Sequence, residues 1–197
     1  DSCNPNNPSG HVYSKEELES LGQLAINHDL FFIVDEVYRE FVYDGHEHIS
    51  VIQLENLSEH AILIDSMSKR YSMCGARIGC LITKNKEVTN AALKFAQSRL
   101  CPPTIALHAS DAALDEPQQY LVNAIDEYQT RRKVAIEHLN KIKGISVYLP
   151  KGAFYCLVKL PVKDSDHFAK WMLESFQDKG ETLMVAPANG FFSGNIT

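Results

Sequence analysis

The chain has 197 residues, of which 45% are hydrophobic and 22% are charged, the proportions of an ordinary globular protein. This length is enough for one large domain or two small ones with a sizeable buried core. The net charge of −6 argues against a nucleic-acid-binding protein, and no apolar run approaches the ~18 residues that a membrane-spanning helix needs.

The first forty residues predict a loop, a helix and a strand, in that order. Asn4–Gly10 is rich in Asn and Pro and indicates a loop. Ser14–Glu17 has the pattern of a capping box, so a helix is expected from there to Asp29. Leu30–Val34 is a continuous apolar run that ends at Asp35, which is typical of a strand buried on both faces.

Strands and helices then alternate along the next hundred residues. Ala61–Ile64 and Ile78–Thr83 are further strand candidates. Helical patterns cover Lys86–Arg99 and, after two prolines, about Pro117–Lys141. This alternation predicts an α/β fold with a mainly parallel sheet and helices on both of its faces.

The pattern changes after Gly144. Strands are expected at 145–149, 153–160 and 182–185, with one helix at 165–177 between the last two. The sequence therefore predicts a smaller α+β unit at the C-terminal end of the chain.

Residues with charged or reactive side chains lie at or just after the ends of two predicted strands. Asp35 and Asp65 lie at strand ends, where ligands bind in open α/β sheets. Ser66-Met67-Ser68-Lys69 follows at once, and Arg77 lies between two glycines a few residues later. A desolvated lysine amine is nucleophilic, and hydroxyls with an arginine suit a phosphate dianion. Ser-x-Ser-Lys alone also resembles part of the serine nucleophile motif of penicillin-binding proteins, so the interpretation depends on the order of the motifs together.

Four segments carry a resemblance to a known family. Ser66–Gly79 looks like the pyridoxal-phosphate attachment signature of class I (fold type I) aminotransferases, and its wording is most similar to that of bacterial aspartate aminotransferases. Asn4–Gly10 resembles their Asn-Pro-x-x-Pro-Thr-Gly loop, with Ser in place of Thr. Asp35–Tyr38 matches their cofactor-ring motif, and Pro150–Tyr155 matches a marker of their small domain.

The resemblance implies a role for each matching residue. Lys69 would bond pyridoxal 5′-phosphate covalently and later carry a proton between the substrate and the cofactor. Asp35 would keep the pyridinium nitrogen protonated, so that the ring accepts electrons. The other implied contacts are hydrogen bonds of Tyr38 and Asn7 to the phenolic oxygen, and phosphate contacts of Ser66, Ser68 and Arg77.

The same resemblance implies the organisation of a larger protein. Residues 1–103 would be the C-terminal part of a large cofactor-binding domain, 104–143 a connecting helical region and 144–197 a truncated small domain. The chain begins within a predicted loop and stops without a terminating element, so we expect a piece of the C-terminal half. The arginine that binds the substrate carboxylate is expected beyond residue 197, and the neighbouring subunit of a homodimer would complete the site.

Localisation and substrates are expectations of the same kind. Five scattered cysteines without C-x-x-C spacing favour free thiols in a reducing cytoplasm, and the histidines show no metal-binding spacing. No signal-peptide pattern is present at Asp1–Pro5. The implied reaction is amino-group transfer between an amino acid, aspartate first, and a 2-oxo acid such as 2-oxoglutarate, without a membrane or nucleic-acid partner.

Two other readings share the same scaffold. A carbon–sulfur lyase or an aminocyclopropane carboxylate synthase would have the same lysine and aspartate, although the lyases usually have Asp-Glu-Ile-His where this chain has Asp-Glu-Val-Tyr. A non-catalytic regulatory domain of aminotransferase-like fold would follow a DNA-binding domain and would have no chemical need for Lys69.

Overall fold

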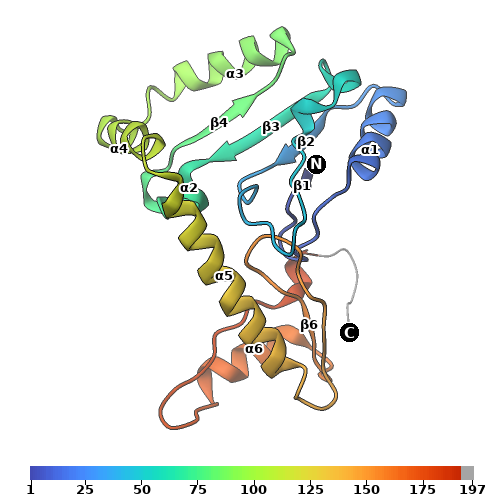
Figure 1. Cartoon of the computed structure of the whole chain (residues 1–197), viewed down its shortest axis with the longest axis vertical. Helices are drawn as coiled ribbons and strands as arrows, with labels where there is room; N and C mark the ends of the chain where they lie inside the picture. The colour runs from blue at the N-terminus through green and yellow to red at the C-terminus, as the bar shows by residue number, and fades with distance from the viewer. Residues whose placement is uncertain (192–197) are drawn as a thin grey trace. The chain divides into compact units, whose positions relative to one another are not determined.

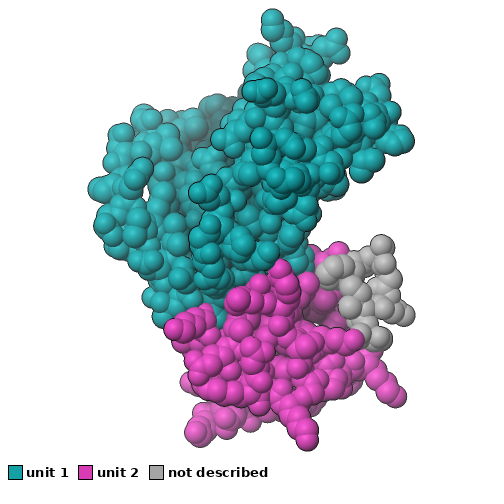
Figure 2. Space-filling model, turned by 45° about the vertical axis from the view of Figure 1, so that its right-hand side comes forward, with its two compact units in different colours: residues 1–132, 150–155 teal, residues 133–149, 156–197 magenta. Residues whose placement is uncertain are grey.

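The computed structural model of the chain describes residues 1–191. It divides into two compact units, one of residues 1–132 with 150–155 and one of residues 133–149 with those after 155 (Figure 2). The domain limits expected from the sequence stay a prediction. Within the described residues, no helix is both long enough and apolar enough to cross a membrane.

A four-stranded sheet forms the centre of the first unit (Figure 1). Its strands β1 (Ser2–Cys3), β2 (Phe32–Asp35), β3 (Ala61–Ser66) and β4 (Gly79–Ile82) lie side by side in chain order. The first three are parallel and β4 runs antiparallel to β3. The predicted α/β class is confirmed, whereas β1 was not expected because two residues inside a turn-rich segment give no strand pattern.

Helix α1 (Lys15–Asn27) begins where its capping box predicts. The Ser14 side chain accepts from the Glu17 amide at 3.2 Å, and the Glu17 carboxylate accepts from the Ser14 amide at 2.8 Å. The helix packs its Leu18 against Val34 of β2 and Leu63 of β3, all nearly inaccessible to solvent. This apolar cluster covers one face of the sheet.

The second face of β2 is more open than the apolar run predicts. Phe31 and Ile33 are 53% and 38% exposed, whereas Phe32 and Val34 are buried. The expectation of burial on both faces was therefore wrong for this strand. Alternate side chains point to opposite faces, and the described part of the chain supplies a full cover for only one of them.

The remaining helices of the first unit follow the sheet along the chain. Helix α3 (Lys86–Ser98) confirms the predicted helix, and α5 (Gln118–Leu139), whose residues 133–139 belong to the second unit, confirms the long one. Helix α4 (Thr104–Leu114) was expected only as part of the connecting helical region and not as a separate helix, because small residues dominate it and hide its period. The shorter helices are α2 (Met67–Arg70), η1 (Val51–Gln53), η2 (Glu55–Leu57) and η3 (Cys74–Ala76).

The second unit contains the antiparallel pair β5 (Ser146–Val147) and β6 (Val158–Lys159), helix α6 (Ser165–Glu174) and η4 (Ala188–Phe191). The strand expected at 182–185 does not form, since no described segment pairs with it and Leu183 and Met184 are 62% and 77% exposed. That expectation was wrong.

The strand expected at 153–160 is reduced to β6 for a different reason. Its first residues belong to the first unit, where Gly152 forms a bridge with Val42 and the Ala153 amide donates to the Phe41 carbonyl at 2.9 Å. Residues 152 and 153 thus pair with the segment 41–43 and do not extend β6 toward the N-terminus.

Candidate functional site

A cavity of about 280 Å³ lies in the first unit at the carboxyl ends of β2 and β3. Its volume is close to the lower end of the roughly 300–1,000 Å³ typical of ligand sites. Because neighbouring parallel strands end at the same edge of a sheet, residues distant in sequence meet there. Every residue that the sequence singled out lines this cavity: Asn7, Asp35, Tyr38, Ser66, Ser68, Lys69 and Arg77.

Asp35 and Tyr38 come from the end of β2 and the turn that follows it. The Asp35 carboxylate accepts a hydrogen bond from the Val37 amide at 3.0 Å, which holds the turn. The buried Tyr38 hydroxyl lies 2.7 Å from the hydroxyl of Tyr155. Burial, followed by this hydrogen bond, raises the pKa of Tyr38 well above its ordinary value. Tyr38 therefore stays a neutral phenol that can donate to a ligand oxygen.

Ser66, Ser68 and Lys69 come from the end of β3 and the single turn α2. The Ser66 hydroxyl accepts a hydrogen bond from the Ser68 amide at 3.2 Å, so it caps the turn. The Lys69 Nζ lies 5.9 Å from the centroid of the Tyr38 ring. The Lys69 amine, which follows β3, thus lies close to the Tyr38 ring, which follows β2.

Arg77 occupies an unusual backbone conformation. Its φ of 58° and ψ of 41° place it in the left-handed region, where residues other than Gly are uncommon. Its Nη1 donates to the Cys74 carbonyl at 2.9 Å, and the guanidinium lines the cavity. Strained backbone of this kind concentrates at ligand sites, where surrounding structure holds it.

The Asn4–Gly10 loop forms the wall that carries Asn7. Asn4 is fully buried, and its amide side chain donates to the Ile49 carbonyl and accepts from the Tyr13 amide. Ser9, which replaces the Thr of the family's motif, donates its hydroxyl to Asn6 at 2.6 Å. The loop is therefore held by its own side chains on both sides of Asn7.

The groups around the cavity suit one class of ligand. A carboxylate favours a protonated ring nitrogen, and a lysine amine can bond an aldehyde. A guanidinium with two hydroxyls suits a phosphate dianion. The set as a whole fits an aromatic aldehyde that carries both a ring nitrogen and a phosphate.

Comparison with known proteins agrees with this chemistry. The family model for aminotransferase class I and II matches residues 2–178. The chain belongs to the class I and II aminotransferases. This family uses pyridoxal 5′-phosphate, which is an aldehyde with the ring nitrogen and phosphate that the cavity fits.

Individual aminotransferases cover nearly all of the chain. The chain is 33% identical to an aspartate aminotransferase of Bacillus subtilis over 96% of its length, which is 49% of that protein. The solved structure of an aspartate aminotransferase from Rhizobium meliloti has a TM-score of 0.79 and 30% identity, covering 88% of this chain and 47% of that one. An alanine aminotransferase from Pyrococcus furiosus has a TM-score of 0.79 and 36% identity over 87% and 45%. The chain thus spans about half the length of the aminotransferases it matches.

Several cavity residues were not expected from the sequence. Cys3, Val37, Ile64 and Cys74 also line it, as does Asp65, which the sequence had placed at a strand end without a role at the site. Burial raises the pKa of the Cys3 thiol to about 11, so this thiol stays protonated beside Pro5, whose carbonyl accepts its hydrogen bond. Tyr155 was expected only as part of a marker motif, and its contact with Tyr38 depends on a fold that joins residues 117 positions apart.

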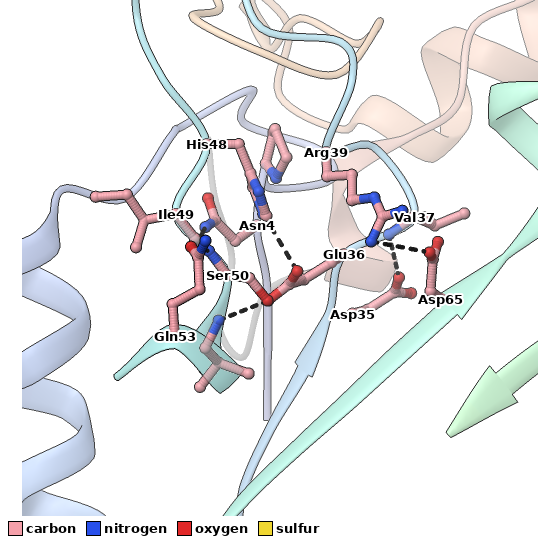
Figure 3. Close-up of polar contacts among 12 residues, drawn as sticks. Asn4, Asp35, Glu36, Val37, Arg39, His48, Ile49, Ser50, Gln53 and Asp65 are labelled. Atoms are coloured by element: carbon pink, nitrogen blue, oxygen red, sulfur yellow. Dashed lines mark hydrogen bonds and ion pairs between the residues drawn. The ribbon is translucent and has the colours of Figure 1, made fainter. Parts of the chain in front are cut away.

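Glu36, the second residue of the cofactor-ring motif, was given no role from the sequence. Figure 3 shows its side chain turned toward His48 and Ser50, and it is fully buried. Its carboxylate accepts from the Ser50 hydroxyl at 2.9 Å and from the Val51 amide at 2.8 Å. A buried glutamate directly after Asp35 thus connects the turn after β2 to the segment at 48–51.

Proposed function

We propose that the protein carrying this chain is a pyridoxal-phosphate-dependent transaminase whose cofactor is bonded at Lys69. One observation carries the proposal: Lys69 and Asp35, 34 positions apart, line the same cavity. When bound, the cofactor supplies an electron sink for breaking bonds at the substrate's α carbon.

Each of the seven candidate residues then has a defined task. Asp35 holds a proton on the ring nitrogen, and the Lys69 Nζ moves a proton between the substrate's α carbon and the cofactor. Tyr38 and Asn7 donate hydrogen bonds to the phenolic oxygen. The phosphate is held by Ser66, Ser68 and Arg77.

The proposed substrates are an L-amino acid and a 2-oxo acid, with aspartate and 2-oxoglutarate as the first pair to test. Aspartate is favoured by the names of several similar proteins, although the names of others include alanine and aromatic amino acids. We further propose a homodimer in the cytoplasm, in keeping with five cysteines that are free thiols. The domain limits 1–103, 104–143 and 144–197 are part of the same proposal.

Covalent labelling tests the role of the lysine. The full-length protein is incubated with pyridoxal 5′-phosphate, reduced with borohydride and digested, and the labelled peptide is identified by mass spectrometry. We expect the label on Lys69. Lys69→Ala should lose the label and slow amino transfer from aspartate to 2-oxoglutarate by at least about 10²-fold, the size of a general acid–base contribution.

Lys84→Ala is the matched control, because Lys84 is exposed and comes from the same unit. It should keep both the label and the rate. A label that persists in Lys69→Ala contradicts the proposal. Release of pyruvate from cystathionine faster than amino transfer would instead indicate a carbon–sulfur lyase.

A further inference from the structure

Two arginines and two carboxylates form a closed cluster beside the cavity, which we call the four-charge cluster: Arg39, Glu40, Asp65 and Arg70. Arg70 places its Nη2 2.9 Å from Asp65 Oδ2 and its Nε 2.7 Å from Glu40 Oε1. Arg39 contacts the same two oxygens, with Nε 2.9 Å from Glu40 and Nη1 3.4 Å from Asp65. Each arginine therefore bridges both carboxylates.

Burial distinguishes this cluster from the surface ion pairs of the chain. The side chains of Arg70 and Asp65 are 7% and 6% exposed, and that of Glu40 is 19% exposed. Burial by itself lowers the pKa of Arg70, but hydrogen bonds to Asp65 and Glu40 outweigh it and raise that pKa. Two positive and two negative charges balance, so the cluster is neutral as long as all four members remain.

The position of the cluster in the sequence connects it to the cavity. Asp65 and Arg70 stand immediately before and after Ser66–Lys69, the segment that carries three of the proposed cofactor contacts. Asp65 holds Arg70 through one carboxylate oxygen and the Ser66 amide, at 2.7 Å, through the other. Both ends of the segment are therefore held by one carboxylate.

The cluster also joins the two walls of the cavity. Arg39 and Glu40 directly follow Tyr38 on the β2 side, whereas Asp65 and Arg70 belong to the β3 side. Figure 3 shows Arg39 reaching from the segment after β2 to Asp65 on β3. The cluster therefore connects the segment that carries Tyr38 to the segment that carries Lys69.

We propose that Arg70 and Asp65 are positioning residues, which set the Lys69 amine and the Ser66 hydroxyl through the four-charge cluster. The proposal rests on the proposed function, since it concerns how Lys69 meets its cofactor. Stability alone gives little reason for such a cluster, because well-packed apolar side chains commonly replace buried ion pairs without loss. Four mutually bridged charges do restrict the geometry, since each guanidinium fork fits only one arrangement of its carboxylates.

The test compares Arg70→Met with Arg131→Met in the full-length protein. Arg131 also forms an ion pair, with Glu127, but both side chains are more than half exposed and lie away from the cavity. Both variants lose one guanidinium. Arg70→Met breaks the four-charge cluster, whereas Arg131→Met breaks only the exposed ion pair with Glu127. The measurements are the dissociation constant of pyridoxal 5′-phosphate, the borohydride label on Lys69 and the pH midpoint of the bound cofactor's absorbance.

Arg70→Met should weaken cofactor binding by about tenfold or more and reduce the label on Lys69. It also leaves the cluster with a net negative charge, which favours the protonated form of a nearby nitrogen, so the pH midpoint should move upward. Arg131→Met should change none of these. Arg70→Lys keeps the charge and should restore the midpoint, while its affinity stays lower because an ammonium lacks the fork.

Two results would overturn the proposal. One is an Arg70→Met protein that melts at a lower temperature but keeps the affinity and midpoint of Arg131→Met, which would make the cluster purely structural. The other is an Arg70→Lys protein whose midpoint is displaced as far as that of Arg70→Met.

If Arg70→Met does not fold, Arg39→Met decides the question. It removes the same charge from a side chain that is 36% exposed, and it should move the midpoint in the same direction. An unchanged midpoint would reject the proposal. Failure of the proposed function is separate, because it appears in the wild-type protein as absence of the label on Lys69.

Discussion

At the scale of single residues, Glu36, which directly follows Asp35, forms a buried acid–base pair with His48. Glu36 Oε2 lies 3.5 Å from His48 Nε2, and their side chains are 0% and 11% exposed. Burial raises the pKa of Glu36 to about 7 and lowers that of His48 to about 4, because it disfavours the charged form of both. Between these values the folded protein keeps the carboxyl protonated and the imidazole neutral.

The two residues affect stability with opposite signs as the pH changes. The folded pKa of Glu36 lies above its ordinary value of 4.5, so its contribution to stability falls as the pH rises from about 4.5 to about 7. The folded pKa of His48 lies below its ordinary value of 6.5, so its contribution rises between about pH 4 and 6.5. Together they nearly cancel across the shared range.

Single substitutions should reveal the two slopes. In Glu36→Gln only His48 of the pair contributes a pH dependence. We therefore expect the free energy of unfolding of this variant, relative to the wild type, to rise between pH 4.5 and 6.5 by up to about 1.4 kcal/mol per pH unit. His48→Gln should give the opposite slope over the same range. Urea unfolding at several pH values measures both, and equal slopes in all three proteins would contradict the paired titration.

At the scale of elements, the Asn4–Gly10 loop and the Pro150–Gly152 turn are packed backbone to backbone. The Gly10 carbonyl accepts from the Lys151 and Gly152 amides, both at 2.9 Å. Gly10 has a φ of +69°, and a Cβ placed there would lie 2.2 Å from the Pro150 Cβ. The position therefore needs glycine both for its backbone angle and for its space.

Gly10→Ala and Gly45→Ala separate these two requirements. Gly45 has a similar φ of +74°, but no described atom lies within 4 Å of its Cβ position. Gly45→Ala should cost roughly 1–2 kcal/mol from the left-handed backbone alone. Gly10→Ala should cost about 1–3 kcal/mol more from overpacking.

Denaturant unfolding measures both losses, and cofactor affinity adds a second readout. Gly10→Ala should also weaken pyridoxal 5′-phosphate binding, because the displaced loop carries Asn7. Equal losses of stability in the two variants would show that the close approach to Pro150 has no energetic weight.

At the scale of the whole molecule, the described chain leaves part of its sheet unprotected. Leu81 of β4 is 41% exposed, and Phe31 and Ile33, just before and within β2, are 53% and 38% exposed; β3 lies between these two strands. We expect exposed apolar side chains on two strands of one sheet to belong to an association surface. The chain also spans only about half the length of the relatives it matches, so we expect these side chains to be covered in the full-length protein.

The isolated 197-residue chain is therefore expected to be inactive and to self-associate. We predict no measurable amino transfer from aspartate under conditions where the full-length protein is active, and light scattering above the mass of one 22.1 kDa chain. Full-length protein assayed in parallel is the control. Transamination by the isolated chain at an ordinary rate would contradict this prediction.

The sequence by itself predicted much of the local structure and the candidate residues of the site. The Ser14 capping box placed α1, and the apolar runs before Asp35 and Asp65 placed the strands whose ends form the cavity. These signals are short-range, because a cap or an alternation of side chains is complete within a few residues. The order of the motifs was enough to select all seven candidate residues that the cavity brings together.

Only the tertiary structure decided which charges are buried and which segments find partners. Arg70 and Arg131 have the same chemistry in the sequence, yet one bridges two buried carboxylates and the other lies in solvent. The 182–185 segment has strand propensity but no described partner, and a strand cannot form without one. Burial and pairing depend on residues far away in the chain, and no local pattern contains that information.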